Sequence, residues 1–170
     1  AGLTQTEEVI KEPFDLYGAE VPIGKYKFNN LNISFRGDRT KNISLNANAS
    51  IGEYFNGTRN SYGVSATFKP GYKFSLNMGL DKNLVTFPGI SVNADIYTLK
   101  IKYNHSVKLF NTLYFQYNGA EEKLVTNFRM NLIHAPLSDL FLVYSNVSDL
   151  NSNEKDTGMI ALKFTKLFSL

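Results

Sequence analysis

Apolar and polar residues alternate along most of this chain, and this period of two limits the fold more than any other feature. In residues 43–52, Ile43 and Leu45 alternate with Ser44 and Asn46. Successive side chains of a β-strand point to opposite faces of its sheet, so the alternation predicts strands with one apolar and one polar face. The same pattern recurs over residues 61–69, 72–81, 97–104, 124–132 and 160–170.

Further strands are less regular. Residues 109–118 and 139–148 are rich in β-forming residues, and the second contains a continuous apolar run. Residues 25–36 also predict a strand, but the apolar positions change phase after Phe28, which predicts a β-bulge near Asn29 and Asn30.

Strand length separates two classes of all-β protein. Most alternating segments run about 9–11 residues, which a tilted strand needs to cross a bilayer, against about 5–6 in soluble sheets. Charged residues make up only 19% of the 170 residues, whereas aromatic residues reach 14%. The polar positions carry Ser, Asn, Thr and Gly, which suit a hydrated lumen. The pattern favours an antiparallel transmembrane β-barrel, with a soluble β-barrel or sandwich around an apolar cavity as the alternative.

The expected connections alternate between short and long. Longer ones are expected at residues 53–60, 82–95 and 147–156. Outer-membrane barrels have short periplasmic turns and longer outside loops, so the expected location is the bacterial outer membrane with the C-terminus in the periplasm. Residues 1–24 then form an N-terminal strand and an outside loop, and residues 25–170 the membrane strands.

The first predicted strand, near residues 3–11, lacks an apolar face and contains Glu7 and Glu8. With it the chain supplies about ten strands, an even number as in bacterial barrels. A lipid-facing Glu is costly, and an open sheet edge in a bilayer is costlier. We therefore expect this chain to be part of a larger barrel.

Two sets of residues are candidates for a site on such a barrel. The predicted lumen-facing residues are charged: Lys69, Lys73, Asp81, Lys100, Lys102, Arg129 and Lys163. The predicted interface girdle is aromatic: Tyr62, Phe68, Tyr72, Tyr97, Tyr103, Tyr117 and Phe168. The basic interior favours anions or acidic saccharides, or else its charges pair with a plug or with further strands.

The sequence predicts no catalytic or metal site and no cofactor. His105 and His134 fall in separate turns without the spacing of metal ligands. The absence of cysteine excludes disulfides and thiolate chemistry. Lys and Arg exceed Asp and Glu by 18 to 15, and this net charge of +3 is too small to indicate a nucleic-acid partner. An outer-membrane hydrolase is the second alternative, although no Ser–His pairing is evident.

Several short motifs occur in a defined order, among them the P-x-G-x-Y-x-F pattern of residues 22–28, Phe87-Pro88-Gly89 and the segment 138–144. This order resembles the C-terminal outer-membrane β-barrel domain of Bacteroidota-type proteins that carry a family 9-like carbohydrate-binding domain upstream. The segment 132–137 and the final Leu170 depart from that family's pattern.

The resemblance implies a membrane anchor, channel or transport element with a glycan-related role or a place in an outer-membrane complex. The implied partners are the lipid bilayer with its lipopolysaccharide, upstream barrel strands or partner subunits, and a saccharide.

Overall fold

The computed structural model describes residues 1–16, 18–151 and 156–167, which form strands and turns. The strands are β1 (Gly2–Ile10), β2 (Phe14–Leu16), β3 (Ala19–Val21), β4 (Gly24–Arg36), β5 (Ile43–Tyr54), β6 (Gly57–Phe68), β7 (Phe74–Phe87), β8 (Ile90–Asn93), β9 (Ile96–Asn104), β10 (Leu109–Asn118), β11 (Lys123–Ala135), β12 (Ser138–Asp149) and β13 (Thr157–Phe164). No helix long and apolar enough to cross a membrane occurs in these ranges.

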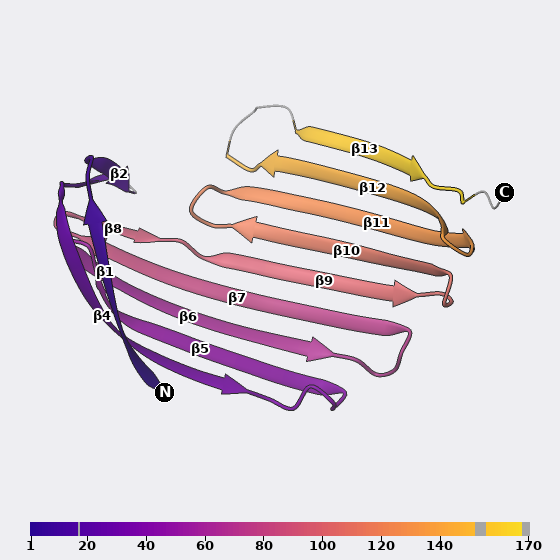
Figure 1. The fold of residues 1–170 in the computed structure, drawn as a ribbon, viewed down its shortest axis with the longest axis horizontal. Coiled ribbons are helices and arrows are strands. Elements are labelled where there is room, and N and C mark those ends of the chain that lie inside the picture. The colour runs from indigo at the N-terminus through magenta and orange to yellow at the C-terminus, as the bar shows by residue number, and fades with distance from the viewer. Residues whose placement is uncertain (17, 152–155, 168–170) are drawn as a thin grey trace.

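The strands form one large antiparallel meander (Figure 1). Its order is β1-β4-β5-β6-β7-β9-β10-β11-β12-β13, with β8 paired to the far end of β7, and β2 and β3 form a separate hairpin. Each strand therefore pairs with a near neighbour in sequence. The predicted all-β antiparallel class is confirmed.

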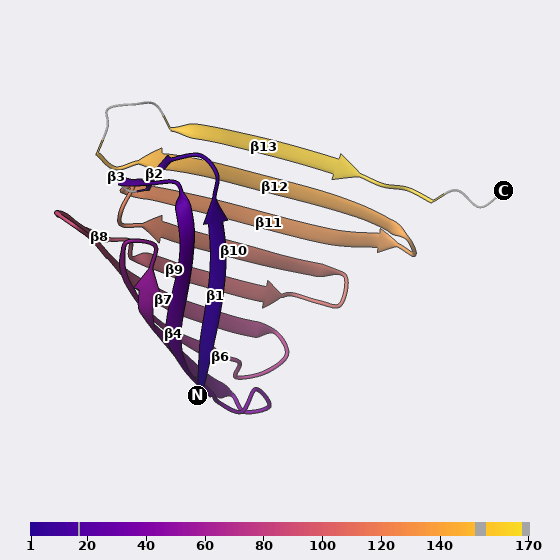
Figure 2. The same ribbon diagram turned by 60° about the vertical axis from the view of Figure 1, so that its left-hand side comes forward.

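The described strands form an open sheet that does not close into a barrel, so the structure shows the antiparallel sheet and not the barrel. Within the described ranges β1 pairs only with β4, and β13 pairs only with β12. Hydrogen-bonded neighbours lie about 4.8 Å apart, whereas β1 and β13 stand well apart in both views (Figures 1 and 2). The curl of the sheet carries β1 and β4 around without bringing β1 to the opposite edge.

The sheet curls toward its polar face. Thr6 and Glu8 of β1 line one hollow together with Arg59 and Ser61 of β6, although β4 and β5 lie between these strands. Side chains from such distant strands can meet only on the concave side. Because Ser61 belongs to the polar set of β6, the apolar set lies on the convex side.

The predicted bulge at Asn29 and Asn30 is wrong. β4 keeps one continuous register against β1 through both residues, and its ladder with β5 runs without a shift from Asn30 to Arg36. The apolar pattern changes phase because Phe28 faces the concave side, whereas Leu31 faces the convex side. A register shift in the main sheet lies elsewhere, between Ile133 and Ala135 of β11.

Two predicted loops are mostly strand. β5 and β6 meet at a tight turn with Tyr54 opposite Gly57, so residues 53–60 hold no long loop. β7 continues to Phe87 and turns back through Pro88 and Gly89 into β8. Gly89 has a φ of 83°, a left-handed conformation that residues with a side chain rarely adopt. A proline followed by such a glycine is common in tight turns.

The buried core is small and lies at one end of the concave face. It contains Ala19, Val85 and Phe87, and the partly buried Leu16, Tyr54, Phe55 and Ile90 pack against it. The β2–β3 hairpin supplies Ala19, so this hairpin folds over the end of the sheet. The rest of the sheet has no second layer among the described residues.

Candidate functional site

The convex face of the sheet is largely apolar across the middle of β5 to β13, whereas β1 and β4 place Glu7, Lys25 and Lys27 on it. The cross-strand register aligns one residue from each of eight strands, β5 to β7 and β9 to β13, into a row: Ile43, Phe68, Leu76, Ile101, Leu113, Phe128, Tyr144 and Ile160. A parallel row joins Leu45, Ala66, Met78, Leu99 and Phe115. Many of these side chains are largely exposed, for example Ile43 at 61% and Ile160 at 73%.

Such a face needs a cover. A sheet in a soluble domain buries its apolar face against a second layer, and exposed apolar patches larger than a few hundred Å² mark contact with a partner or a membrane. The described part of the chain offers no layer for this face. The candidate site is therefore the sheet itself, with its apolar convex face and its polar concave face.

The predicted girdle residues lie largely on this face. Tyr62, Phe68, Tyr97, Tyr103 and Tyr117 all share the convex phase of their strands. The rings of Tyr97 and Tyr117 lie 6.1 Å apart at one end, and Tyr103 packs edge-on against His105 at the other.

The other two girdle candidates lie outside the strands that the structure describes. Tyr72 lies in the turn between β6 and β7 and is 83% exposed. Phe168 lies outside the described residues.

Most predicted lumen residues share the concave face. Asp81, Lys100, Lys102, Arg129 and Lys163 all occupy its phase in their strands. Lys100, Lys102 and Arg129 line one hollow between β9 and β11. The structure thus brings three of the predicted cations together.

Lys69 and Lys73 lie just outside β6 and β7, at the turn that joins them. The Lys73 ammonium lies 5.8 Å from the centre of the Tyr72 ring, and Lys69 lines a different hollow.

The concave face is less uniformly polar than the sequence pattern predicts. Near β13 it carries Phe141, Val143 and Ala161 beside the cations. The Arg129 guanidinium lies 5.0 Å from the centre of the Phe141 ring, a cation–π contact. The continuous apolar run of residues 139–148 was the signal for this patch.

An aromatic cluster covers the concave face beside the turn between β5 and β6. Phe55 is its centre, and its ring centroid lies 4.8–5.6 Å from those of Phe14, Tyr26, Phe28 and Tyr54. Phe55 has a φ of 50°, a left-handed conformation uncommon for a residue with a side chain. The sequence signal for this cluster is the phase change within β4, from which the sequence alone predicts a bulge.

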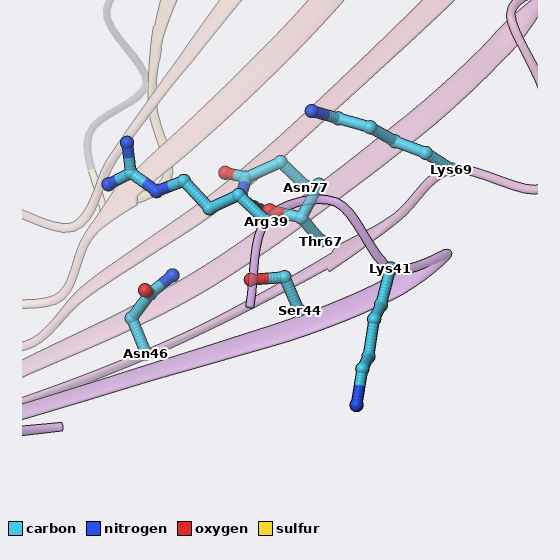
Figure 3. A pocket seen from close by; sticks show the side chains of 7 residues that line it. All are labelled: Arg39, Lys41, Ser44, Asn46, Thr67, Lys69 and Asn77. Atoms are coloured by element: carbon cyan, nitrogen blue, oxygen red, sulfur yellow. Dashed lines mark hydrogen bonds between the residues drawn. The ribbon is translucent and has the colours of Figure 1, made fainter. Parts of the chain in front are cut away.

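A basic hollow lies on the concave face at the short-turn end of the sheet, where β4 connects to β5 and β6 to β7 (Figure 3). Of its three cations, only Lys69 is predicted from the sequence as a site residue. Its lining residues are Arg39, Lys41, Ser44, Asn46, Thr67, Lys69 and Asn77. β5, β6 and β7 supply the polar side chains, whereas the loop after β4 supplies Arg39 and Lys41. The hollow measures about 280 Å³.

Hydrogen bonds within this hollow are incomplete. The Asn77 amide donates to Thr67 Oγ1 at 2.8 Å, and the Asn46 amide donates to Ser65 Oγ at 3.3 Å. The buried Ser44 Oγ and Asn46 Oδ1 have no hydrogen-bond partner among the described residues.

The Asp38 carboxylate fixes the loop that carries Arg39. It accepts hydrogen bonds from the Thr40 hydroxyl at 2.7 Å and from the Thr40 backbone N–H at 2.9 Å. These bonds, the hydroxyl's first, hold the pKa of Asp38 below its ordinary range. The Asp38 carboxylate is therefore hydrogen-bonded to Thr40 within its own loop.

Acidic residues elsewhere on the sheet are paired or dispersed. Lys25 and Lys27 of β4 approach Glu7 of β1 at 2.5 and 3.5 Å, and Lys82 lies 3.7 Å from Asp95. Among the residues with described positions, no group of three or more His, Asp or Glu side chains could hold a metal ion.

The two histidines are far from such a group. The His134 ring stacks on Phe164 at 5.0 Å, and His105 Nε2 lies 3.2 Å from the Asn111 amide.

No family model, curated protein or solved structure matches this chain. The resemblance to the Bacteroidota-type barrel domain therefore stays a prediction from its motifs.

Proposed function

We propose that this chain is a membrane-spanning part of a bacterial outer-membrane β-barrel, in which it acts as an anchor, channel or transport element. The observation that carries this proposal is the row of apolar side chains that runs from β5 to β13 on the convex side of the curled sheet. Lipid is the cover that such a face needs, and a polar concave side suits a hydrated lumen.

Strand length supports the proposal. β5, β6 and β11 contain 12, 12 and 13 residues. At about 3.3 Å per residue and a tilt near 45°, such strands cross the apolar band of about 25 Å.

The curl direction argues against the soluble alternative. A soluble β-barrel that binds an apolar ligand needs its apolar residues on the concave side. Here the concave side carries Asp81, Lys100 and Lys102, whereas Val64 and Met78 lie on the convex side with 56% and 48% exposure.

The edge strands β1 and β13 need hydrogen-bond partners in a bilayer. An unpaired edge in hydrocarbon leaves backbone N–H and C=O groups without partners, each at a cost of several kcal/mol. In the proposed barrel, further strands from the same polypeptide or from a partner subunit pair with β1 and β13. A glycan-related role and contact with lipopolysaccharide belong to the same proposal through the family resemblance.

The test is refolding of the chain with and without lipid. The purified protein is diluted from urea into plain buffer, into detergent micelles and into liposomes, which are then floated on a density gradient. We expect β-structure and flotation with the liposomes, and aggregation in plain buffer. A monodisperse folded protein in plain buffer that does not float would contradict the proposal.

A further inference from the structure

We propose that the basic hollow at the short-turn end of the concave face binds a water-borne oxyanion carried on a hydroxylated molecule, such as a sugar phosphate or a uronate. The site consists of Arg39 and Lys69 as cations with Ser44, Asn46 and Asn77 as polar partners (Figure 3). It deepens the proposed function, on which it rests only for the compartment that supplies the ligand.

The charge of the hollow is unbalanced. None of the residues that line it is acidic, and within the described residues neither Arg39 nor Lys69 forms an ion pair with a carboxylate. The nearby Asp38 is engaged by Thr40 instead. Two uncompensated cations at a partly enclosed polar site favour an anion, and the fork of an arginine matches the geometry of a phosphate or carboxylate.

Lys41 contributes less to this charge. Its ammonium points away from the other lining side chains, whereas the Arg39 guanidinium lies on the side of Asn46 and the Lys69 ammonium on the side of Asn77 (Figure 3). The two cations that count therefore come from different connections, the loop after β4 and the turn after β6.

Two buried polar atoms in the hollow await partners. Ser44 is only 6% exposed, yet its Oγ has no partner among the described groups, and the same holds for Asn46 Oδ1. A buried polar atom without a hydrogen bond costs about 1–3 kcal/mol. The Ser44 hydroxyl can donate to an oxyanion, whereas Asn46 Oδ1 can only accept and therefore needs a hydroxyl or amine donor.

These complementary needs define the ligand class. A simple anion satisfies Arg39, Lys69 and Ser44 but leaves the Asn46 oxygen without a donor. A neutral sugar satisfies Asn46 but leaves the cations without a counter-charge. A molecule with both an oxyanion and hydroxyl groups satisfies all four residues.

The ligand reaches the site from water rather than from lipid. Ser44, Asn46 and Asn77 all lie on the concave face, opposite the face that we assign to lipid. A phospholipid head group offers the same phosphate chemistry. To place it in the hollow, however, the lipid would have to leave the bilayer on the convex side and bring its acyl chains to the polar concave side.

The experiment measures binding to the detergent-refolded chain by isothermal titration calorimetry, with glucose 6-phosphate, inorganic phosphate and glucose as probes. We expect glucose 6-phosphate to bind most tightly, phosphate more weakly, and glucose not measurably. A parallel arm adds phosphatidylglycerol to the micelles to test the lipid source.

Three variants make the result specific. Arg39→Gln removes a charge-assisted contact and should weaken glucose 6-phosphate binding at least tenfold, and Ser44→Ala should weaken it several-fold. Lys108→Gln is the matched control, because it removes an exposed cation from the turn between β9 and β10, outside the hollow, and should leave affinity unchanged. Circular dichroism checks that each variant is folded, and the loop variant Arg39→Gln keeps the test decisive if Ser44→Ala does not fold.

Three outcomes would contradict the proposed site. Arg39→Gln could bind glucose 6-phosphate as tightly as wild type, or glucose could bind as tightly as glucose 6-phosphate. The third is that phosphatidylglycerol occupies the hollow and none of the water-soluble probes binds. A chain that floats with liposomes but fails these titrations loses the site and keeps the proposed function. A chain that binds glucose 6-phosphate but folds in plain buffer keeps the site and loses the membrane role.

Discussion

The ring centroids of Phe28 and Phe55 lie 5.1 Å apart with their planes at 74°, an edge-to-face contact between the middle of β4 and the β5–β6 turn. Phe55 adopts its left-handed φ in this turn, at a cost of about 1–3 kcal/mol for a residue with a side chain. The contact explains why a bulky aromatic occupies a position that suits Gly or Asn. Its ring joins the turn to Phe14, Tyr26 and Tyr54, which compensates for the backbone strain.

Replacing Phe55 with Ala should destabilise the fold by about 2–4 kcal/mol, because the variant keeps the strained φ and loses the ring contacts. Urea unfolding of the detergent-refolded protein measures this change. Phe68→Ala is the control, since Phe68 lies on the convex face with one ring contact, to Phe74 at 6.5 Å. Equal effects of the two substitutions would show that the cluster carries no special stability.

Gly52 allows β4 and β5 to approach closely. A Cβ at this position would lie 2.2 Å from the Asn29 carbonyl oxygen and 2.8 Å from the Asn30 Cα. Both atoms belong to the backbone, so no rotamer change relieves the clash.

Gly52→Ala should therefore destabilise the protein by about 1–3 kcal/mol, the usual range for overpacking. Gly71→Ala is the matched control, because a Cβ there meets no atom within 4 Å. Unfolding midpoints in urea compare the two variants. A Gly52→Ala midpoint as high as that of Gly71→Ala would mean that β4 separates from β5 at no cost.

The alternation of apolar and polar residues was enough to predict most strands of the sheet. Residues 109–118 match β10 at both ends, and β9 starts one residue earlier than predicted. The period of two works here because most strands from β5 to β13 have one side that is largely apolar over its middle. Where that condition fails, the predictions fail with it.

The failures concentrate at the two ends of the concave face. At the loop end, Phe28, Val85 and Phe87 are apolar residues in the polar phase. Val85 and Phe87 pack with Ala19 and Leu16 of the β2–β3 hairpin, and Phe28 packs against Phe55, contacts that no local pattern predicts. At the turn end, Arg39 lies in a loop, and only the three-dimensional fold brings it beside Ser44 and Lys69. Closure also lies beyond local patterns, because it depends on the accumulated curl of all the strands.

The loop that carries Arg39 should loosen in acid. The pKa of Asp38 is lowered in the folded protein, so its bonds to Thr40 stabilise the loop fully above the unfolded pKa and are lost as pH falls through the folded value. That window lies below about pH 4. The protection factor of the Thr40 amide against hydrogen exchange should therefore fall on acidification through this window.

Asp38→Asn is the informative variant for this loop. Its amide oxygen can still accept the bond from Thr40, but it does not titrate. Exchange at Thr40 in the variant should show no acid-induced step beyond the chemical exchange rate. The same step in both proteins would assign it to another group.

The convex face should tolerate a charge in water but not in lipid. Val64 lies near the middle of the apolar stretch of β6 and is 56% exposed. Val64→Arg should reduce the stability of the protein folded in liposomes by about 2–4 kcal/mol if this side chain faces the bilayer midplane. Asn48→Arg on neighbouring β5 is the matched control, because Asn48 faces the concave side close to Asp81 and Gly63.

The comparison is made by urea titration of each variant in liposomes of one lipid, with tyrosine fluorescence as the signal. Asn48→Arg should fold nearly as wild type, since its guanidinium stays in water and can pair with Asp81. The difference between the two variants isolates the lipid contribution, because both introduce the same side chain on adjacent strands. A Val64→Arg chain that folds into liposomes as well as Asn48→Arg would place water or protein, rather than lipid, against the convex face.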